Sequence, residues 1–312
     1  MRAHPNTRVR IALQRRLAAD AERLVAHWDD ALGGDPEAVR RVRIASRRLR
    51  QALAVIARVR TLRAAEASAR TLGIIGRTFG PLRDTAMTAA LLASGEALPE
   101  LEGATRELRA DLDRELRARV ASARRRTRSV SARRLAERLA SISADMDTAA
   151  ATTSWATALT VLVAARTTAV SDAARACGTL YEPERLHALR LAIKKLRYVT
   201  ELAADASLVP RSIPARLARH QQHLGAWHDR VIALELMRER DARDGPRASW
   251  ARLEEMLERD ARVRHGQIVG KLGALARVVD DVRGRLAGLA RGSRGTPMRA
   301  SLPRVRSVKR VG

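Results

Sequence analysis

The sequence contains one cysteine, and aromatic residues make up only 2% of its 312 residues. A single thiol, Cys177, excludes a disulfide framework and a zinc site built from cysteines. Proteins that read single-stranded nucleic acids stack bases on aromatic side chains, and this chain has few of them. The low aromatic content therefore disfavours base recognition but leaves binding to a nucleic-acid backbone open.

Long apolar runs are also missing. The most apolar stretch, Ala156 to Ala165, is too short to cross a bilayer. The segment from Met1 to Arg10 lacks the apolar core of a signal peptide. We therefore expect a soluble cytoplasmic protein that has no membrane partner.

Negative charge is scarce relative to positive charge. The chain has 60 Lys and Arg against 34 Asp and Glu, a formal net charge of +26, and lysine occurs only at positions 194, 195, 271 and 309. Such an excess indicates a polyanionic partner or a solvated basic surface. Arginine suits phosphate because its planar fork can donate two hydrogen bonds at once. A GC-rich genome would also raise the arginine total, but it does not explain where each arginine falls.

The abundance of Ala, Leu and Arg, with few β-branched runs, predicts an all-α protein. Proline and glycine fall between periodic segments, which sets the expected helix boundaries. The first set of helices is expected near 7–32, 36–61, 64–79, 82–94, 99–121 and 127–145. The second is expected near 153–178, 184–204, 212–224, 229–242, 247–264 and 268–290. Residues 291–312 have no periodicity and are predicted to be a basic disordered tail.

The chain also repeats itself. Residues 39–50, VRRVRIASRRLR, align with residues 186–197, LHALRLAIKKLR, at an offset of 147. Pro36 and Pro183 precede the two copies at the same offset, while Gly80 and Asp84 pair with Gly225 and Asp229 at an offset of 145. These markers predict an internal duplication into two helical bundles, residues 1–150 and 151–290, related by a pseudo-two-fold axis.

Each copy carries basic side chains at positions i, i+3, i+7 and i+10. At about 100° per residue these positions fall within a sector of roughly 80° on a helix, at the border of the apolar face. Such a stripe can be a solvated face whose long stems cover the core. Its repetition favours instead a groove between two facing helices that would attract a linear polyanion. The stripes are Arg40, Arg43, Arg47 and Arg50, and His187, Arg190, Lys194 and Arg197.

These motifs resemble the CHAD domain, a family named for conserved histidines in an α-helical domain. The resemblance rests on residues 186–201, which match closely, and on the segments Leu82-Arg83-Asp84 and Leu224–Asp229; it covers about residues 8–290. It implies two four-helix bundles around a basic pore that binds inorganic polyphosphate without catalysis and associates with polyphosphate granules. No cofactor is implied.

The resemblance also implies which residues contact phosphate. Arg40 stands where the family has histidine, so any pH sensing in this chain would rest on His187. The expected polyphosphate-binding residues are Arg40, Arg43, Arg47, Arg48, Arg50, His187, Arg190, Lys194, Lys195 and Arg197.

Other patterns leave alternatives open. His220, His223, His228 and Asp229 could bind a transition metal, but they lack a full ligand set at standard spacing, and we expect no metal site. Asp84 and Asp229 are interpreted as helix N-caps after a turn. The basic cluster Arg124–Arg128, with Arg133 and Arg134, can extend a polyanion track or form a solvated helix edge.

Three further functions compete with polyphosphate binding. The main alternative is a basic protein that binds nucleic acid non-specifically through the phosphate backbone. His187 could accept a phosphoryl group, but phosphotransfer modules use a lone exposed histidine, whereas His187 sits among cations. An enzyme acting on phosphorylated substrates lacks support because the sequence shows no Walker-type phosphate loop and no nucleophile–base arrangement. We therefore expect a binding protein that is not an enzyme.

Overall fold

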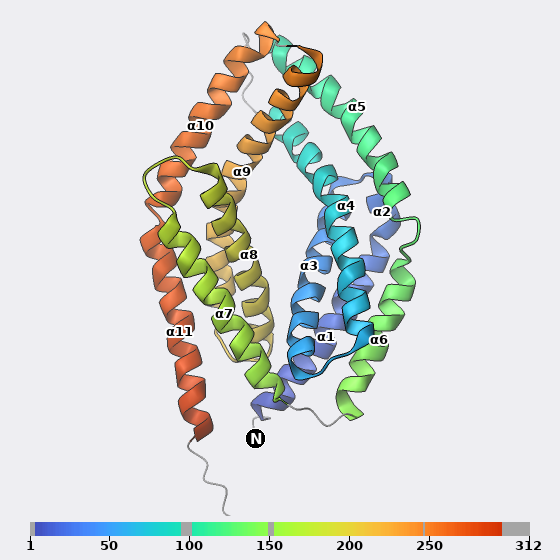
Figure 1. The fold of residues 1–312 in the computed structure, drawn as a ribbon, viewed down its shortest axis with the longest axis vertical. Helices are drawn as coiled ribbons and strands as arrows, with labels where there is room; N and C mark the ends of the chain where they lie inside the picture. Colours follow the sequence, from blue (N-terminus) through green and yellow to red (C-terminus); the bar gives the residue numbers. More distant parts are fainter. Residues whose placement is uncertain (1–3, 95–101, 149–152, 246, 295–312) are drawn as a thin grey trace, which may run out of the picture.

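A computed structural model describes residues 4–94, 102–148, 153–245 and 247–294, and every regular element within these ranges is helical. The predicted all-α class is therefore confirmed (Figure 1). The first half of the chain forms α1 (Pro5–Ala26), α2 (Trp28–Gly33), α3 (Pro36–Val59), α4 (Arg63–Ser94), α5 (Glu102–Arg126) and α6 (Ala132–Thr148). The second half forms α7 (Trp155–Ala176), α8 (Pro183–Asp205), α9 (Ser212–Asp244), the short 3-10 helix η2 (Ala248–Trp250), α10 (Ala251–Val269) and α11 (Leu272–Arg294).

Local sequence explains where the two stripe-bearing helices begin. The Asp35 side chain accepts a hydrogen bond from the Ala38 backbone N–H at 2.6 Å, and Pro36 occupies the first turn of α3. Pro183 takes the same place at the start of α8. Proline is favoured there because its missing N–H would have no helical partner and its φ is already helical. The matching prolines therefore fix the start of both helices.

Two predicted helix breaks are absent. The turns expected near Gly80 and Gly225 do not form, because α4 and α9 are each continuous and Pro81 lies inside α4. The interpretation of Asp84 and Asp229 as N-caps is accordingly wrong, since both lie within helices. Leu72, Phe79 and Leu82 are at most 1% exposed along one face of α4. Burial of this face on both sides of Pro81 outweighs the loss of one backbone hydrogen bond.

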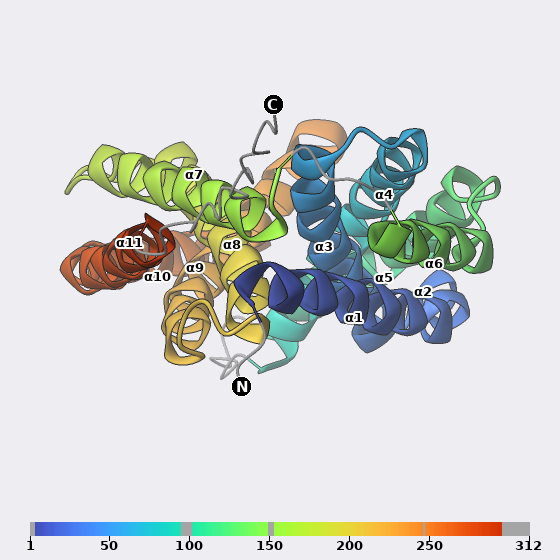
Figure 2. The same cartoon turned by 90° about the horizontal axis from the view of Figure 1, so that it is seen from below.

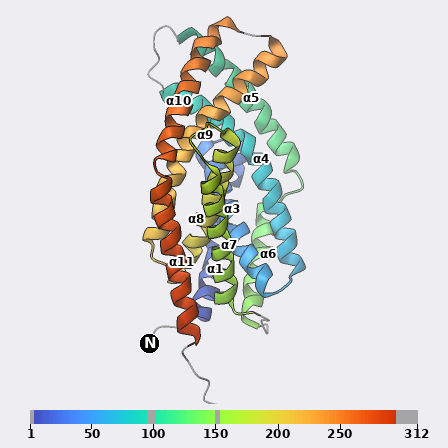
Figure 3. The ribbon, with the colours of Figure 1, turned by 60° about the vertical axis from the view of Figure 1, so that its left-hand side comes forward.

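The two halves meet at two separate places. At the base, α1 lies across the molecule and contacts α3 and α6 of the first half and α7 and α8 of the second (Figure 2). Helix α3 also contacts α7 and α8 directly. At the opposite end, α4 contacts α9 and α5 contacts η2. Figure 3 shows α10 and α11 following one another along one side of the second half. Between the two contact regions, α3 and α4 face α8 and α9 (Figure 1).

Two apolar clusters match these two regions. The larger one includes Leu13 of α1, Leu49 of α3 and Ile193 of α8, all fully buried. The smaller one joins Leu108 and Leu112 of α5 to residues of α9 and α10 such as Met237. Burial of apolar surface at both ends stabilises the spacing of the helices between them.

The division at residue 150 and the duplication remain predictions. Helix α11 runs to Arg294, past residue 291, at which the tail was expected to begin, and residues 295–312 of that tail lie outside the described residues. Among the described helices, none combines the length and the apolar character needed to cross a membrane.

Candidate functional site

A groove with a volume of about 910 Å³ lies between the two halves. Its walls are formed by α3 and α4 on one side and by α8 and α9 on the other, so each stripe-bearing helix contributes one wall. Three of the four residues of each stripe thus line a common space.

Most of the predicted site residues line this groove. They lie one helical turn apart along α3 and α8 and point between the walls. Arg47 is half-buried, whereas Arg190 and Lys194 are only 5% and 8% exposed. The predicted residues that line the groove are Arg40, Arg43, Arg47, Arg190, Lys194 and Arg197.

The other predicted residues lie outside the groove lining. Arg50 and Lys195 are exposed at positions that do not line it. His187 is also exposed, and its ring lies against that of His228, with 5.4 Å between centroids. Arg48 donates from Nε to Oε2 of Glu201 at 2.9 Å. Contact of Arg48, Arg50, His187 and Lys195 with phosphate remains a prediction, and the groove geometry does not support it.

The groove also contains cations that the sequence pattern did not reveal. Arg83 of α4 lies with Nη1 3.1 Å from Asp84 and 3.2 Å from Asp229, so one guanidinium bridges the two halves. Arg230 of α9 lines the groove as well and donates to Asp260 at 2.7 Å. Neither arginine belongs to the repeated stripe, and position 83 corresponds to His228 at the offset of 145. The only usable signal was that each arginine is adjacent to a repeated aspartate.

Glycine leaves room for the Arg43 side chain. The Arg43 Nη1 donates to the Gly76 carbonyl oxygen at 3.4 Å. A Cβ at Gly80 would lie 3.1 Å from that same Nη1. The missing side chain at Gly80 therefore lets the guanidinium lie along the α4 backbone at the edge of the groove.

Burial and crowding lower the pKa of the central cations. Burial, reinforced by repulsion from Arg190 and Arg47, lowers the pKa of Lys194 to about 5. Burial also lowers the pKa of Arg190 to about 10 and that of Arg43 to about 9, with further repulsion from neighbouring arginines. At neutral pH the arginines stay charged, whereas Lys194 is largely neutral in the free protein.

Within the described ranges, four central basic side chains have no carboxylate at ion-pair distance. Carboxylates that line the groove are engaged elsewhere, since Glu37 pairs with Arg40 at 3.1 Å and Asp229 with Arg83. The Nε of Arg190 is buried and has no hydrogen-bond partner among the described residues. The four are Arg43, Arg47, Arg190 and Lys194.

The histidines near the groove are neutral at physiological pH. Burial, followed by repulsion from Arg190 and Lys194, lowers the pKa of both His187 and His228. The effect is largest for His228, which is 6% exposed. In the part of the chain that the structure describes, no group of three or more His, Cys, Asp or Glu side chains could hold a metal ion.

Solved structures share this fold. The CHAD domain from the plant Ricinus communis aligns with a TM-score of 0.58 and 20% identity, over 91% of this chain and 92% of that one. PptA from Streptomyces chartreusis aligns with a TM-score of 0.54 and 17% identity, over 88% of this chain and 99% of the other. At 20% and 17% identity, these similarities show that the chain shares the fold of the two proteins. No curated protein matches the sequence.

The family assignment rests on the sequence match. A family model described as the CHAD domain matches residues 15–238, which include α3, α4, α8 and every residue that lines the groove. That range spans more than half of the 312 residues. The chain therefore belongs to the CHAD domain family.

Proposed function

We propose that the protein binds inorganic polyphosphate, without catalysis, in the groove between α3, α4, α8 and α9. The observation that carries the proposal is a set of four central basic side chains, three charged arginines and Lys194, that lack a carboxylate partner within the described residues. Keeping buried or half-buried basic side chains charged without a partner is costly, and an anionic ligand would supply the missing charge. The CHAD family is linked to polyphosphate in general, which supports this choice of anion.

The composition of the groove favours a phosphate chain without bases. Tyr198 is the one aromatic residue among the groove-lining residues, so a run of bases would find little to stack on. Arginine forks from opposite walls can each donate two hydrogen bonds to phosphate oxygens. Affinity would come from these charge-assisted bonds and from release of counterions.

Association with polyphosphate granules is the cellular consequence that we infer. Granules expose the same polymer at high density, so a non-catalytic binding groove would be enough to localise the protein to them. We infer no cofactor or metal for this role.

Competition between polyanions tests the proposal. Labelled long-chain polyphosphate bound at physiological salt is challenged with single- and double-stranded DNA at equal phosphate concentration. We expect the polyphosphate to stay bound. If DNA displaces it phosphate for phosphate, the protein is a general binder of polyanions, and non-specific nucleic-acid binding becomes the better description.

Charge reversal tests the location of binding. Arg47→Glu combined with Lys194→Glu should abolish polyphosphate binding, because both positions lie in the centre of the groove. The matched control is Arg50→Glu with Lys195→Glu, which makes the same charge change on the same two helices at exposed positions outside the groove. The control should bind with little loss. Circular dichroism would verify that both variants fold, and equal loss in both would contradict the groove assignment.

A further inference from the structure

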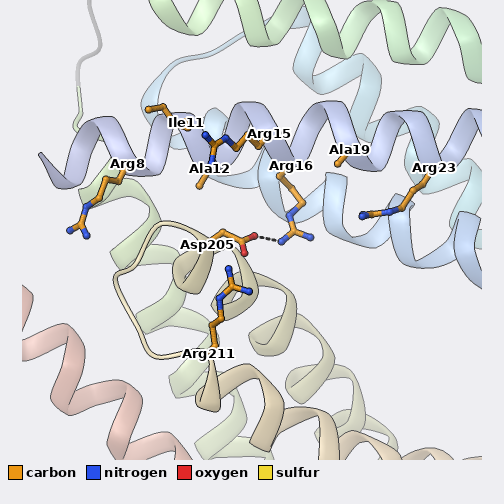
Figure 4. A pocket seen from close by; sticks show the side chains of 9 residues that line it. All are labelled: Arg8, Ile11, Ala12, Arg15, Arg16, Ala19, Arg23, Asp205 and Arg211. Atoms are coloured by element: carbon orange, nitrogen blue, oxygen red, sulfur yellow. Dashed lines mark hydrogen bonds and ion pairs between the residues drawn. The ribbon is translucent and has the colours of Figure 1, made fainter. Parts of the chain in front are cut away.

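A second arginine-rich pocket lies outside the groove, and we propose that it is an additional binding site for condensed phosphate. The pocket has a volume of about 530 Å³ and lies between α1 and the turn that joins α8 to α9 (Figure 4). We call it the α1 pocket. It is lined by Arg8, Ile11, Ala12, Arg15, Arg16, Ala19, Arg23, Asp205 and Arg211.

The charge of the α1 pocket is strongly unbalanced. Asp205 is the only carboxylate in its lining, and it is already bound by Arg16. Figure 4 shows Arg211 directed toward the same carboxylate from the opposite side of the pocket. Arg8, Arg15 and Arg211 have no carboxylate at ion-pair distance among the described residues. Like charges that line one pocket repel one another, and a bound anion would offset this repulsion.

An unsatisfied hydrogen-bond donor on Arg8 is a second, independent indication of a ligand. Its Nε is buried and has no hydrogen-bond partner among the described residues. A buried donor without a partner costs free energy that a bound acceptor would recover. Phosphate oxygens are suitable acceptors, because each can receive several N–H donors from neighbouring guanidinium groups.

The lining also restricts the chemical class of the ligand. No aromatic side chain lines the pocket, and its apolar members are Ile11, Ala12 and Ala19. A nucleotide base would therefore have nothing to stack on, whereas a short run of linked phosphates would meet arginines from both walls. This inference deepens the polyphosphate proposal and rests on it for the identity of the ligand.

An ion-pair network separates the α1 pocket from the groove. The buried Asp20 carboxylate lies 2.8 Å from Arg23 and 3.6 Å from Arg16, both of which line the α1 pocket. Its other neighbour, Arg48, lies 3.9 Å away and pairs with Glu201.

The network reaches the groove through Glu201. That carboxylate lies 3.6 Å from Arg197, which lines the groove. A long polyphosphate chain that leaves the groove on this side would thus find a second cationic site beyond the Asp20–Arg48–Glu201 network.

Titration calorimetry of the full chain with tripolyphosphate tests this proposal. The wild type should show binding at the groove and at the α1 pocket. Arg15→Glu with Arg211→Glu should remove the second site and leave the first, since both side chains are exposed and unpaired within the described residues. Arg109→Glu with Arg117→Glu is the matched control on α5, with the same charge change at exposed positions. The control should retain both sites.

Long-chain polyphosphate provides a second readout. Arg15→Glu with Arg211→Glu should lower the slope of log affinity against log salt by about one unit for each contact removed. An unchanged number of sites and an unchanged slope, relative to the control, would overturn the proposal. Displacement of tripolyphosphate from the α1 pocket by single-stranded DNA, phosphate for phosphate, would overturn the assigned ligand class.

The two proposals fail in different ways. Arg47→Glu with Lys194→Glu should remove the groove site and leave the α1 pocket occupied. If that variant keeps both sites while Arg15→Glu with Arg211→Glu loses one, the groove proposal fails and the α1 pocket stands.

Discussion

Arg48 on α3 and Glu201 on α8 form an ion pair across the two halves, with Nε of Arg48 2.9 Å from Oε2 of Glu201. Glu201 is 15% exposed and Arg48 is 24% exposed, and the fully buried Asp20 lies 3.9 Å from the same guanidinium. The paired Glu201 raises the pKa of Arg48 against the opposing effect of its burial. Arg48 therefore holds the walls of the groove together, and the predicted role of direct phosphate contact is the weaker interpretation.

Removal of the Arg48 side chain should cost stability more than specific binding. We expect Arg48→Met to lower the free energy of unfolding by about 1–3 kcal/mol, because charged hydrogen bonds are lost and two carboxylates keep fewer partners. Urea denaturation measures this change. A double-mutant cycle with Glu201→Gln should give a coupling energy of about 0.5–3 kcal/mol. Arg50→Met, at an exposed position on the same helix, is the control and should be close to neutral.

Lys194 should destabilise the free protein. Its pKa falls from 10.5 to about 5 on folding, so between these values the unfolded chain binds more protons than the folded one. The free energy of unfolding therefore increases as pH rises from about 5 to about 10.5. Near pH 7 the contribution of Lys194 still lowers the stability of the folded state.

Lys194→Met removes this cost and should raise the free energy of unfolding near pH 7 by about 1–4 kcal/mol. The gain should disappear above the usual lysine pKa. The same change should weaken polyphosphate binding. Thermal and urea unfolding across pH measure the first effect, and Lys195→Met at the neighbouring exposed position is the control. A loss of stability in Lys194→Met near pH 7 would show that the ammonium is stabilised in the free protein.

Polyphosphate binding should be coupled to proton uptake. A phosphate chain beside Lys194 restores the charged form of its amine, so its pKa rises from about 5 when the ligand binds. Affinity should therefore decrease as pH rises through neutrality, and His187, whose pKa is lowered by burial, adds a smaller effect at acid pH.

Calorimetry in buffers with different ionisation enthalpies counts the protons taken up on binding. Long chains are the suitable ligand because their titrating end groups are few. The variant Lys194→Met should take up fewer protons than the wild type. Equal uptake in the two proteins would mean that another group titrates.

The periodicity of the sequence identified α3 and α8 as two of the helices that line the groove, but not α4 and α9. Arg43 and Arg47, like Arg190 and Lys194, are four residues apart, a spacing that places both side chains on one face of a helix. The occurrence of this spacing in both copies indicated that the two helices share one function. The resemblance of the sequence motifs to the CHAD domain was confirmed by the family match over residues 15–238. The sequence did not predict that Arg83 of α4 and Arg230 of α9 line the groove, because their positions depend on how the helices pack.

The errors have local causes. Gly80 and Pro81 signal a break in any isolated helix, but buried residues on both sides of them keep α4 continuous. Arg48 shares the repeated motif with groove residues, yet a rotation of one residue along the helix turns it toward Glu201. The α1 pocket was not predicted because its arginines come from α1 and the distant turn at residue 211.

A charged contact also joins the two halves at the end far from α1. Asp111 of α5 is 8% exposed, and its Oδ2 lies 3.2 Å from Arg247 and 3.8 Å from the buried Arg240. The Arg247 guanidinium lies 4.2 Å from the ring centroid of Trp250. These contacts join α5 to the segment that contains η2, beside the smaller apolar cluster.

Neutralisation of Asp111 should loosen this distal contact. Asp111→Asn removes the carboxylate that Arg240 and Arg247 share, while Arg247 keeps Glu107 and Asp244 as partners. We expect a loss of about 1–3 kcal/mol in the free energy of unfolding. Hydrogen exchange should accelerate in α5 and α10 while α3 and α8 stay protected, because the larger apolar cluster holds the base of the molecule. Asp113→Asn, exposed on the same helix, is the control. Uniform acceleration across all helices would instead show that the two halves unfold as one cooperative unit.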